Sequence, residues 1–168
     1  DAENVPDTTM NEIAHATVCF SRAWREALYG VSAYWVLPDQ VKKSAPSGEF
    51  LPKGSFTIEG QRNFIKSETL KLAVGIIQLE DNDHVLTCGP PEAIKKNSIC
   101  YAIIEPNGLE MAECAKKIRL EFLKIFEDIT RKINIDEFVR ALPAGKSQIK
   151  EISLGDLEKE KFIDNELD

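Results

Sequence analysis

The sequence is short of the residues that build metal centres, disulfide frameworks and membrane spans. Its 168 residues include only two histidines, His15 and His84, and the four cysteines show no CxxC spacing. This pattern predicts neither a metal site nor a disulfide framework, and it is typical of reduced cysteines in a cytosolic protein. No apolar run approaches the roughly 20 residues that cross a bilayer, so no membrane contact is expected.

Catalytic motifs are missing as well. An activated nucleophile needs a base beside it, and no GxSxG motif surrounds either histidine. No GxxxxGK(S/T) phosphate-binding loop occurs. Residues 81–83 (Asp-Asn-Asp) are more simply a polar turn than a cation site, and residues 89–91 include two prolines that cannot donate to an anion. The sequence therefore predicts a protein without enzymatic activity and without a cofactor.

Charge is unevenly distributed along the chain. The net charge of −7 argues by itself against nucleic acid. Between residues 40 and 66, however, five basic residues accompany two acidic ones, a net of +3, whereas residues 153–168 carry six acidic residues and two lysines, a net of −4. Because binding depends on the local field more than on the total charge, the basic segment favours contact with phosphates. An ordinary solvated surface explains the same lysines.

Two short strands joined by a long loop are predicted in the first half of the chain. An aromatic and β-branched run at 31–37 predicts a strand that Pro38 ends, because proline cannot donate to a sheet ladder. A loop rich in proline and glycine follows. The second strand is predicted at 55–59, with Phe56 and Ile58 facing inward.

Three aromatic residues have roles that the sequence leaves open. Trp24 lies on the apolar stripe of a predicted helix, where a core position is expected, although a stacking platform for a base is compatible with it. Tyr34 and Trp35 point to opposite faces of their strand. One of them is expected in the core, and the other is expected to cover a neighbouring layer or to be exposed.

Six short motifs carry a resemblance to a known family. In order they are Ser21-Arg22-Ala23-Trp24, Ala33-Tyr34-Trp35-Val36, Asp39-Gln40-Val41-x-Lys43, Ala45-Pro46-Ser47-Gly48-Glu49, Gly54-Ser55-Phe56-x-Ile58 and Gly60-x-Arg62-Asn63-Phe64. Their order and spacing, over about residues 5–66, resemble the second half of the NFACT-R domain of NFACT proteins. The sequence up to about residue 152 is similar, more weakly, to the carboxy-terminal region of archaeal members.

The resemblance implies part of a ribosome-associated quality-control factor. NFACT proteins engage stalled large ribosomal subunits and recruit tRNA, and their NFACT-R domain is inferred to bind RNA. The expected partners are therefore RNA, as tRNA or ribosomal RNA, and the large ribosomal subunit in the cytoplasm. The alternative is a protein-interaction or adhesin-like module that binds fibronectin or fibrinogen, a label that some bacterial relatives carry.

The resemblance also indicates which residues to test. Phosphate contacts are expected from Arg22, Lys42, Lys43, Lys53 and Arg62. Glu49 and Asn63 are expected to form hydrogen bonds within the loop. Because the preceding parts of the family are expected upstream of Asp1, a sheet edge should be uncovered, and a homodimer through residues 31–60 is expected.

The first helix and the fold class follow from local patterns. A capping box at Thr9 and Glu12 predicts a helix that ends near Leu28. Its predicted apolar stripe consists of Ile13, Ala16, Phe20, Ala23, Trp24 and Ala27. Together with the strands, this helix predicts an α+β fold with antiparallel or mixed sheet segments.

The second half of the chain predicts a further sheet and its helices. Strands are expected at 70–80, 85–88, 98–105 and 149–152, the last one at an edge. Helices are expected just after Gly89, at about 109–132 as a long amphipathic helix packed on this sheet, and at 135–142. The predicted organisation is a partial NFACT-R domain at 1–66, an α+β region at 67–152 and an acidic, disordered tail at 153–168.

Overall fold

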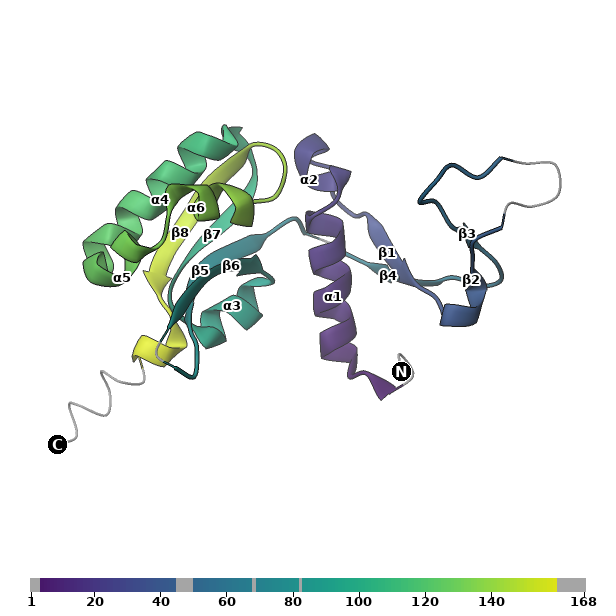
Figure 1. Cartoon of the computed structure of the whole chain (residues 1–168), viewed down its shortest axis with the longest axis horizontal. Coiled ribbons are helices and arrows are strands. Elements are labelled where there is room, and N and C mark those ends of the chain that lie inside the picture. Colours follow the sequence, from purple (N-terminus) through teal and green to yellow (C-terminus); the bar gives the residue numbers. More distant parts are fainter. Residues whose placement is uncertain (1–3, 45–49, 68, 82, 160–168) are drawn as a thin grey trace.

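The computed structural model is an α+β arrangement in which all sheet pairings of the described residues are antiparallel. It describes residues 4–44, 50–67, 69–81 and 83–159. A four-stranded sheet with its helices forms one end, a long hairpin forms the other, and a helix stands between them (Figure 1). We call these ends the four-stranded unit (residues 70–159) and the hairpin arm (residues 31–66).

The four-stranded unit has the strand order β6-β5-β7-β8. Its strands are β5 (Leu72–Gln78), β6 (His84–Gly89), β7 (Ser98–Leu109) and β8 (Ser147–Leu154). The predicted hairpin of β5 with β6 and the predicted edge strand β8 are confirmed. β7 continues past its predicted end because Asn107 and Gly108, with φ of 71° and 100°, form an irregularity after which Leu109 pairs again with β8.

Helices cover both faces of this sheet. α3 (Pro91–Asn97) lies on one face, where Ile94 packs with Tyr101 and Ile103. The helices on the other face are α4 (Met111–Ile125), α5 (Glu127–Lys132) and α6 (Ile135–Ala141) (Figure 1). The larger core lies beneath them and contains Phe122 and Phe138, whose ring centroids are 6.0 Å apart. Within the described part of the chain, every helix is too short or too polar to cross a membrane.

The long helix predicted at 109–132 is divided into two. Phe126 has φ −134° and ψ 74°, outside the helical region, and it separates α4 from α5. Its side chain is half-buried against the core, so tertiary packing outweighs helical continuity at this point. α6 then begins at a capping box, in which Asn134 Oδ1 accepts from the Asp136 N–H at 3.1 Å and Glu137 Oε1 accepts from the Asn134 N–H at 2.9 Å.

The first predicted helix is likewise two helices, α1 (Asp7–Cys19) and α2 (Arg22–Glu26). α1 begins directly after Pro6 without a side-chain cap, so the predicted capping box at Thr9 is wrong. A cap occurs instead at the start of α2, where Ser21 Oγ accepts a hydrogen bond from the Ala23 N–H at 3.1 Å. This serine begins a new helix and turns the chain.

The buried face of α1 also differs from the predicted stripe. Ile13 and Phe20 are exposed by 55% and 48%. The buried residues of α1 are Ala14, Val18 and Cys19. Trp24 is fully buried, as expected, and its Nε1–H donates to the Ser147 hydroxyl at 3.1 Å. The end of α1 and the two buried residues of α2, Ala23 and Trp24, therefore share one core with the sheet. The division between residues 66 and 67 stays a prediction.

The hairpin arm consists of two short antiparallel ladders (Figure 1). β1 (Ser32–Trp35) pairs with β4 (Asn63–Lys66), and β2 (Val41–Lys42) pairs with β3 (Thr57–Ile58). A 3-10 turn, η2 (Pro38–Gln40), lies between β1 and β2. Phe56 is exposed, contrary to the prediction, because β3 is only two residues long and Phe56 precedes it.

The predicted tail begins inside the sheet. Ser153 belongs to β8 and pairs with β7, and helical backbone follows at 156–159. Gly155 between them is buried so close to Ser98 that a Cβ would collide with its carbonyl group, and glycine lets the chain pass there. The predicted disorder is therefore wrong for the first seven residues of the tail, and residues 160–168 lie outside the described part of the chain.

Candidate nucleic-acid interface

A glutamine fastens the bend of the hairpin arm. Gln40 Nε2 donates to the carbonyls of Glu59 and Gln61, both at 2.8 Å, and Gln40 Oε1 accepts from the Leu37 N–H at 2.9 Å. Gly60 lies between the two carbonyls with φ 80°, and a Cβ there would be 3.1 Å from Gln40 Nε2. These hydrogen bonds hold the β2–β3 ladder in place relative to the β1–β4 ladder.

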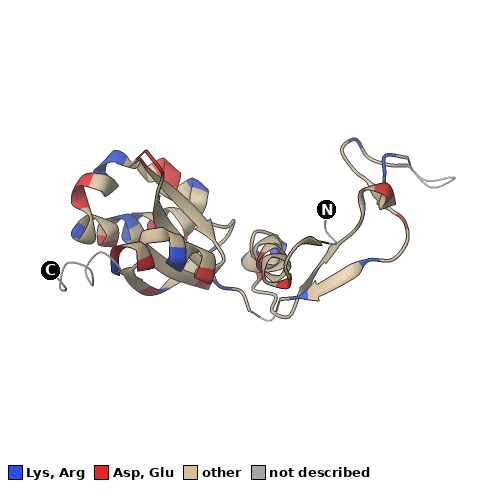
Figure 2. Ribbon diagram, turned by 90° about the horizontal axis from the view of Figure 1, so that it is seen from below, with Lys and Arg blue, Asp and Glu red and all other residues tan. Residues whose placement is uncertain are grey.

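Four of the five predicted phosphate-contacting residues lie along this arm. Lys42 ends β2 opposite Thr57, and Lys43 follows it directly. Lys53 lies in the loop that returns to β3, and Arg62 directly precedes β4. Lys42 is half-buried and the other three are exposed. In Figure 2 the arm carries several basic segments and few acidic ones, whereas both signs are interspersed over the four-stranded unit.

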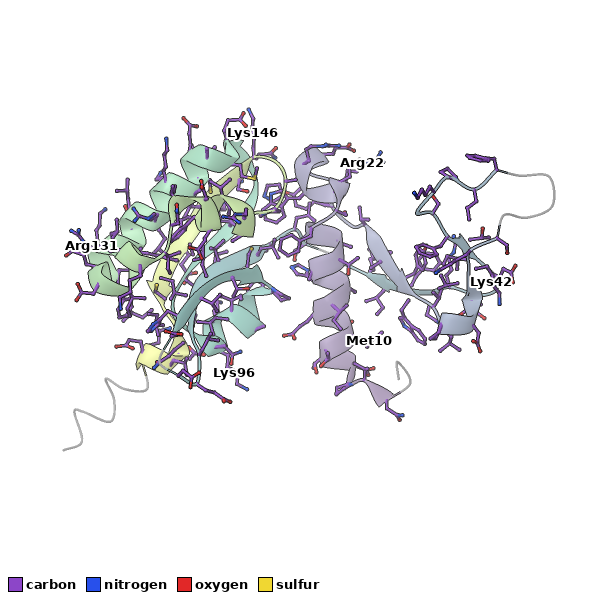
Figure 3. All side chains as sticks on the ribbon, viewed as in Figure 1. Met10, Arg22, Lys42, Lys96, Arg131 and Lys146 are labelled. Atoms are coloured by element: carbon purple, nitrogen blue, oxygen red, sulfur yellow. The ribbon has the colours of Figure 1, made fainter. Side chains whose placement is uncertain are left out.

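The fifth predicted residue, Arg22, is not part of this group. It lies on α2, which is anchored to the four-stranded unit through the buried Trp24. Figure 3 shows Arg22 well away from Lys42. Arg22 Nε is 3.3 Å from the Glu26 carboxylate, one turn further along the helix. The structure therefore separates Arg22 from the four cations of the arm.

The two residues expected to bond within the loop have different outcomes. Asn63 is half-buried, and its Nδ2 donates to the Trp35 carbonyl at 3.5 Å, a long hydrogen bond across the β1–β4 ladder. This agrees with the prediction of an internal role. Glu49 lies outside the described residues.

An aromatic pair lies on the outer side of the β1–β4 ladder, next to Arg62. Tyr34 and Phe64 are directly opposite each other in the register, with ring centroids 5.5 Å apart. The Arg62 guanidinium carbon is 5.0 Å from the centroid of the Tyr34 ring. The sequence analysis missed Phe64 because it predicted no strand at 63–66. The alternation of Arg62, Phe64 and Lys66 is the period-two signal that indicates one face of a strand.

A cavity of about 310 Å³ lies between α1, the end of β4 and the start of α3. His15 lines it, with Nε2 2.6 Å from the Lys71 carbonyl and Nδ1 3.1 Å from the Ser67 hydroxyl. A nitrogen this close to a carbonyl carries the proton, so Nε2–H donates and His15 ties α1 to the segment before β5. His15 is thus engaged structurally, and the described residues place no three His, Cys, Asp or Glu side chains around a common metal position.

The cysteines are buried or half-buried free thiols. Burial raises the pKa of Cys19 and Cys114 to about 11 and that of Cys100 to about 12. Burial also raises the pKa of Cys88. Thiols that stay protonated at neutral pH are poor nucleophiles. The thiols are therefore not expected to react at neutral pH, and the cations and aromatic rings of the hairpin arm are the groups considered for binding.

Comparison with known proteins connects this surface to a family. Residues 1–60 match the profile of the NFACT protein RNA binding domain. The archaeal Rqc2 homolog aRqcH of Methanocaldococcus jannaschii is 33% identical over 147 residues, which are 88% of this chain and 21% of that protein. The ribosome quality control complex subunit NEMF homolog of Drosophila melanogaster is 33% identical over 136 residues, 80% of this chain and 13% of that protein.

A human relative shows the same relationship over a shorter segment. The ribosome quality control complex subunit NEMF of Homo sapiens is 39% identical over 75 residues, 45% of this chain and 7% of that protein. No solved structure matches the chain significantly. The chain spans about a fifth or less of the length of these curated relatives. The ordered motifs, the domain match and the relatives agree: the chain belongs to the NFACT family.

Proposed function

We propose that this chain is the RNA- and ribosome-contacting part of a ribosome quality-control factor. The observation that carries the proposal is the row of cations on the hairpin arm, of which Lys42, Lys43 and Lys53 lie within the segment that matches the NFACT protein RNA binding domain and Arg62 lies just after it. Lysine and arginine side chains on a projecting element can follow a phosphate backbone without reading its sequence. The names of the fly and human relatives, ribosome quality control complex subunits, support a ribosomal setting.

The finer parts of the proposal concern the partner and the compartment. The factor engages stalled large subunits, and the RNA contacted by the arm is tRNA or ribosomal RNA. It acts in the cytoplasm and has no catalytic activity of its own. The adhesin-like alternative is not favoured, because the fly and human relatives carry ribosome quality-control names.

Self-association through the hairpin arm is a further part of the proposal. Within the described residues β1 pairs with β4 alone, so its second edge has no partner strand among them. Pairing of two β1 edges would give a homodimer. Sedimentation equilibrium should then show a dimer that forms with increasing concentration, and a strict monomer at high concentration would contradict this part.

The cations of the arm provide the direct test. The double variant Lys42→Gln/Lys43→Gln should cosediment less with large ribosomal subunits, and its binding to single-stranded RNA should weaken equally for all sequences. The slope of log affinity against log salt should fall by up to about 1.4, at about 0.7 per lost contact. The matched control is Lys116→Gln/Lys117→Gln, which removes two adjacent exposed lysines from α4.

Two results would contradict the proposal. In the first, both double variants cosediment equally well with large subunits, and equally to the wild type. In the second, the α4 control loses binding while the arm variant retains it, which would place the contact on the four-stranded unit. Circular dichroism of both variants should match the wild type, since exposed substitutions leave the fold intact.

A further inference from the structure

The β1–β4 ladder is a ribbon with two chemically different faces. Side chains alternate across a strand, so Ala33, Trp35 and Ile65 share one face. This inner face lies against α1, where Met10 and Ile13 line a small gap together with those three residues and with Tyr34. Figure 1 shows α1 running alongside the ribbon. The inner face is therefore a packing surface.

The outer face of the ribbon carries two aromatic rings that the described structure does not bury. Tyr34 is exposed by 44% and Phe64 by 64%, and they are paired across the strands at 5.5 Å between ring centroids. Exposed apolar side chains that lie next to each other often mark a surface that contacts another molecule. These rings are available for contact with another molecule.

Cations flank the two rings on the same face. Arg62, directly before β4, is two residues before Phe64, and Lys66, at the end of β4, is two residues after it. The Arg62 guanidinium lies over the Tyr34 ring at 5.0 Å. Neither β1 nor β4 contains an acidic residue. The outer face therefore combines stacking surfaces with positive charge, which is complementary to a polyanion with flat apolar groups.

Unpaired nucleotides have this composition. A base offers an aromatic face only when it is not enclosed in a duplex, and proteins bind single strands with aromatic side chains inside a basic surface. A duplex would present phosphates and no free base faces to these rings. A purely apolar protein partner would offer no negative charge to the flanking cations.

We propose that the outer face of the ribbon, made of Tyr34, Phe64, Arg62 and Lys66, binds unpaired bases of single-stranded RNA. Tyr34 and Phe64 stack on the bases, while Arg62 and Lys66 contact the adjoining phosphates. This inference rests on the proposed RNA-binding function and deepens it by naming the form of RNA and the residues that hold it. It predicts a base-dependent part of the affinity in addition to the salt-dependent part.

The test compares two labelled RNA oligonucleotides of equal length, one intact and one with abasic positions in its centre, by fluorescence anisotropy on the whole chain. The wild type should bind the intact strand more tightly. Tyr34→Ala and Phe64→Ala should each weaken that binding by about 5- to 150-fold, equivalent to roughly 1–3 kcal/mol per stacked base, and should hardly affect the abasic strand. Phe64→Trp, which keeps a stacking ring, should retain binding.

A matched control and a fold measurement accompany these variants. Phe20→Ala removes an aromatic side chain with similar exposure from the residue that directly follows α1, outside the ribbon, and should leave binding to both strands unchanged. Thermal unfolding followed by circular dichroism identifies any variant that has lost its structure. Phe64→Leu, which keeps apolar bulk without a ring, should behave like Phe64→Ala if stacking is the cause.

Several outcomes would overturn the inference and separate it from the proposed function. Equal binding of the wild type to intact and abasic strands would remove the stacking role but leave phosphate binding in place. Cosedimentation with large subunits without any oligonucleotide binding would also remove the stacking role, and only the ribosome contact of the proposed function would stand. Loss of self-association in Phe64→Ala, with unchanged oligonucleotide affinity, would assign the face to protein contact. If neither strand nor large subunit binds, the proposed function fails as well.

Discussion

Two aromatic pairs with nearly the same geometry occupy opposite environments in this protein. Phe122 and Phe138, in the four-stranded unit, have ring centroids 6.0 Å apart and an interplanar angle of 60°. Tyr34 and Phe64, in the hairpin arm, are 5.5 Å apart at the same angle. The first pair is almost completely buried, and the second is largely exposed.

The difference shows that ring geometry does not reveal the role of an aromatic pair, whereas its surroundings do. The sheet of the four-stranded unit is covered by helices on both faces, so rings between helix and sheet are removed from water and stabilise the fold. The ribbon of the arm has α1 on one face only, and the rings on its other face are free to bind. Stability and binding are therefore assigned to different regions.

The largest expected effect comes from replacing a phenylalanine by alanine in each of the two regions and comparing the losses of stability. Phe122→Ala should lower the free energy of unfolding by about 3–5 kcal/mol, because it removes buried area and leaves a cavity in the larger core. Phe64→Ala should cost about 1 kcal/mol or less, because the ring is already in water. Urea denaturation measures both. Similar losses for the two variants would mean that the outer face of the ribbon is buried in solution.

Alkaline pH should lower the stability of the four-stranded unit by ionising its buried thiols. The hairpin arm has no cysteine and should not respond in this way. Burial raises the pKa of Cys100 to about 12 from the ordinary value of 9.0. The protonated thiol is favoured in the folded state, so its contribution is fully present below pH 9 and is lost as the pH rises toward 12. Between pH 8 and about pH 10.5, ionisation of this residue alone should lower the free energy of unfolding by about 2 kcal/mol.

The measurement is urea denaturation under reducing conditions at both pH values. Cys100→Ala should lose less stability over this interval than the wild type does, whatever its stability at pH 8. An identical loss in both proteins would show that this thiol does not titrate with unfolding.

The coupling between the two exposed rings should be small. A double-mutant cycle of Tyr34→Ala and Phe64→Ala should give an interaction free energy of about 0.2–1 kcal/mol, as for other cross-strand pairs. Thermal or urea unfolding of the wild type, the two single variants and the double variant supplies the four values. A much larger coupling would indicate that the pair stabilises the ribbon and would weaken its assignment to binding.

The smallest expected change in stability belongs to the basic pair of the arm. Lys42→Gln/Lys43→Gln should alter the free energy of unfolding by less than about 0.5 kcal/mol per residue, while it weakens RNA and ribosome binding. Urea denaturation and cosedimentation on the same preparation separate the two quantities. If the variant loses stability and binding together, the two lysines have a structural role and the prediction is wrong.

The sequence by itself determined the elements whose signals are local. The apolar runs of β5 and β6 and the turn between them predict a hairpin. Pro90 and Pro91 predict the start of α3, and a further helix is predicted at 135–142, where the structure has α6. The basic character of the hairpin arm was predictable for the same reason. Charge, turn residues and periodicity are properties of neighbouring residues, and they persist in any tertiary arrangement.

Only the tertiary structure decided which faces are buried and which residues come together. Ala14 and Val18 are buried while Ile13 and Phe20 are exposed, and Trp35 is half-buried while Tyr34 is exposed. Arg22 is separated from the other predicted cations because α2 is held in the core by Trp24. Burial depends on which distant segment packs against a residue, and that partner is set by the whole fold, so no local pattern could specify it.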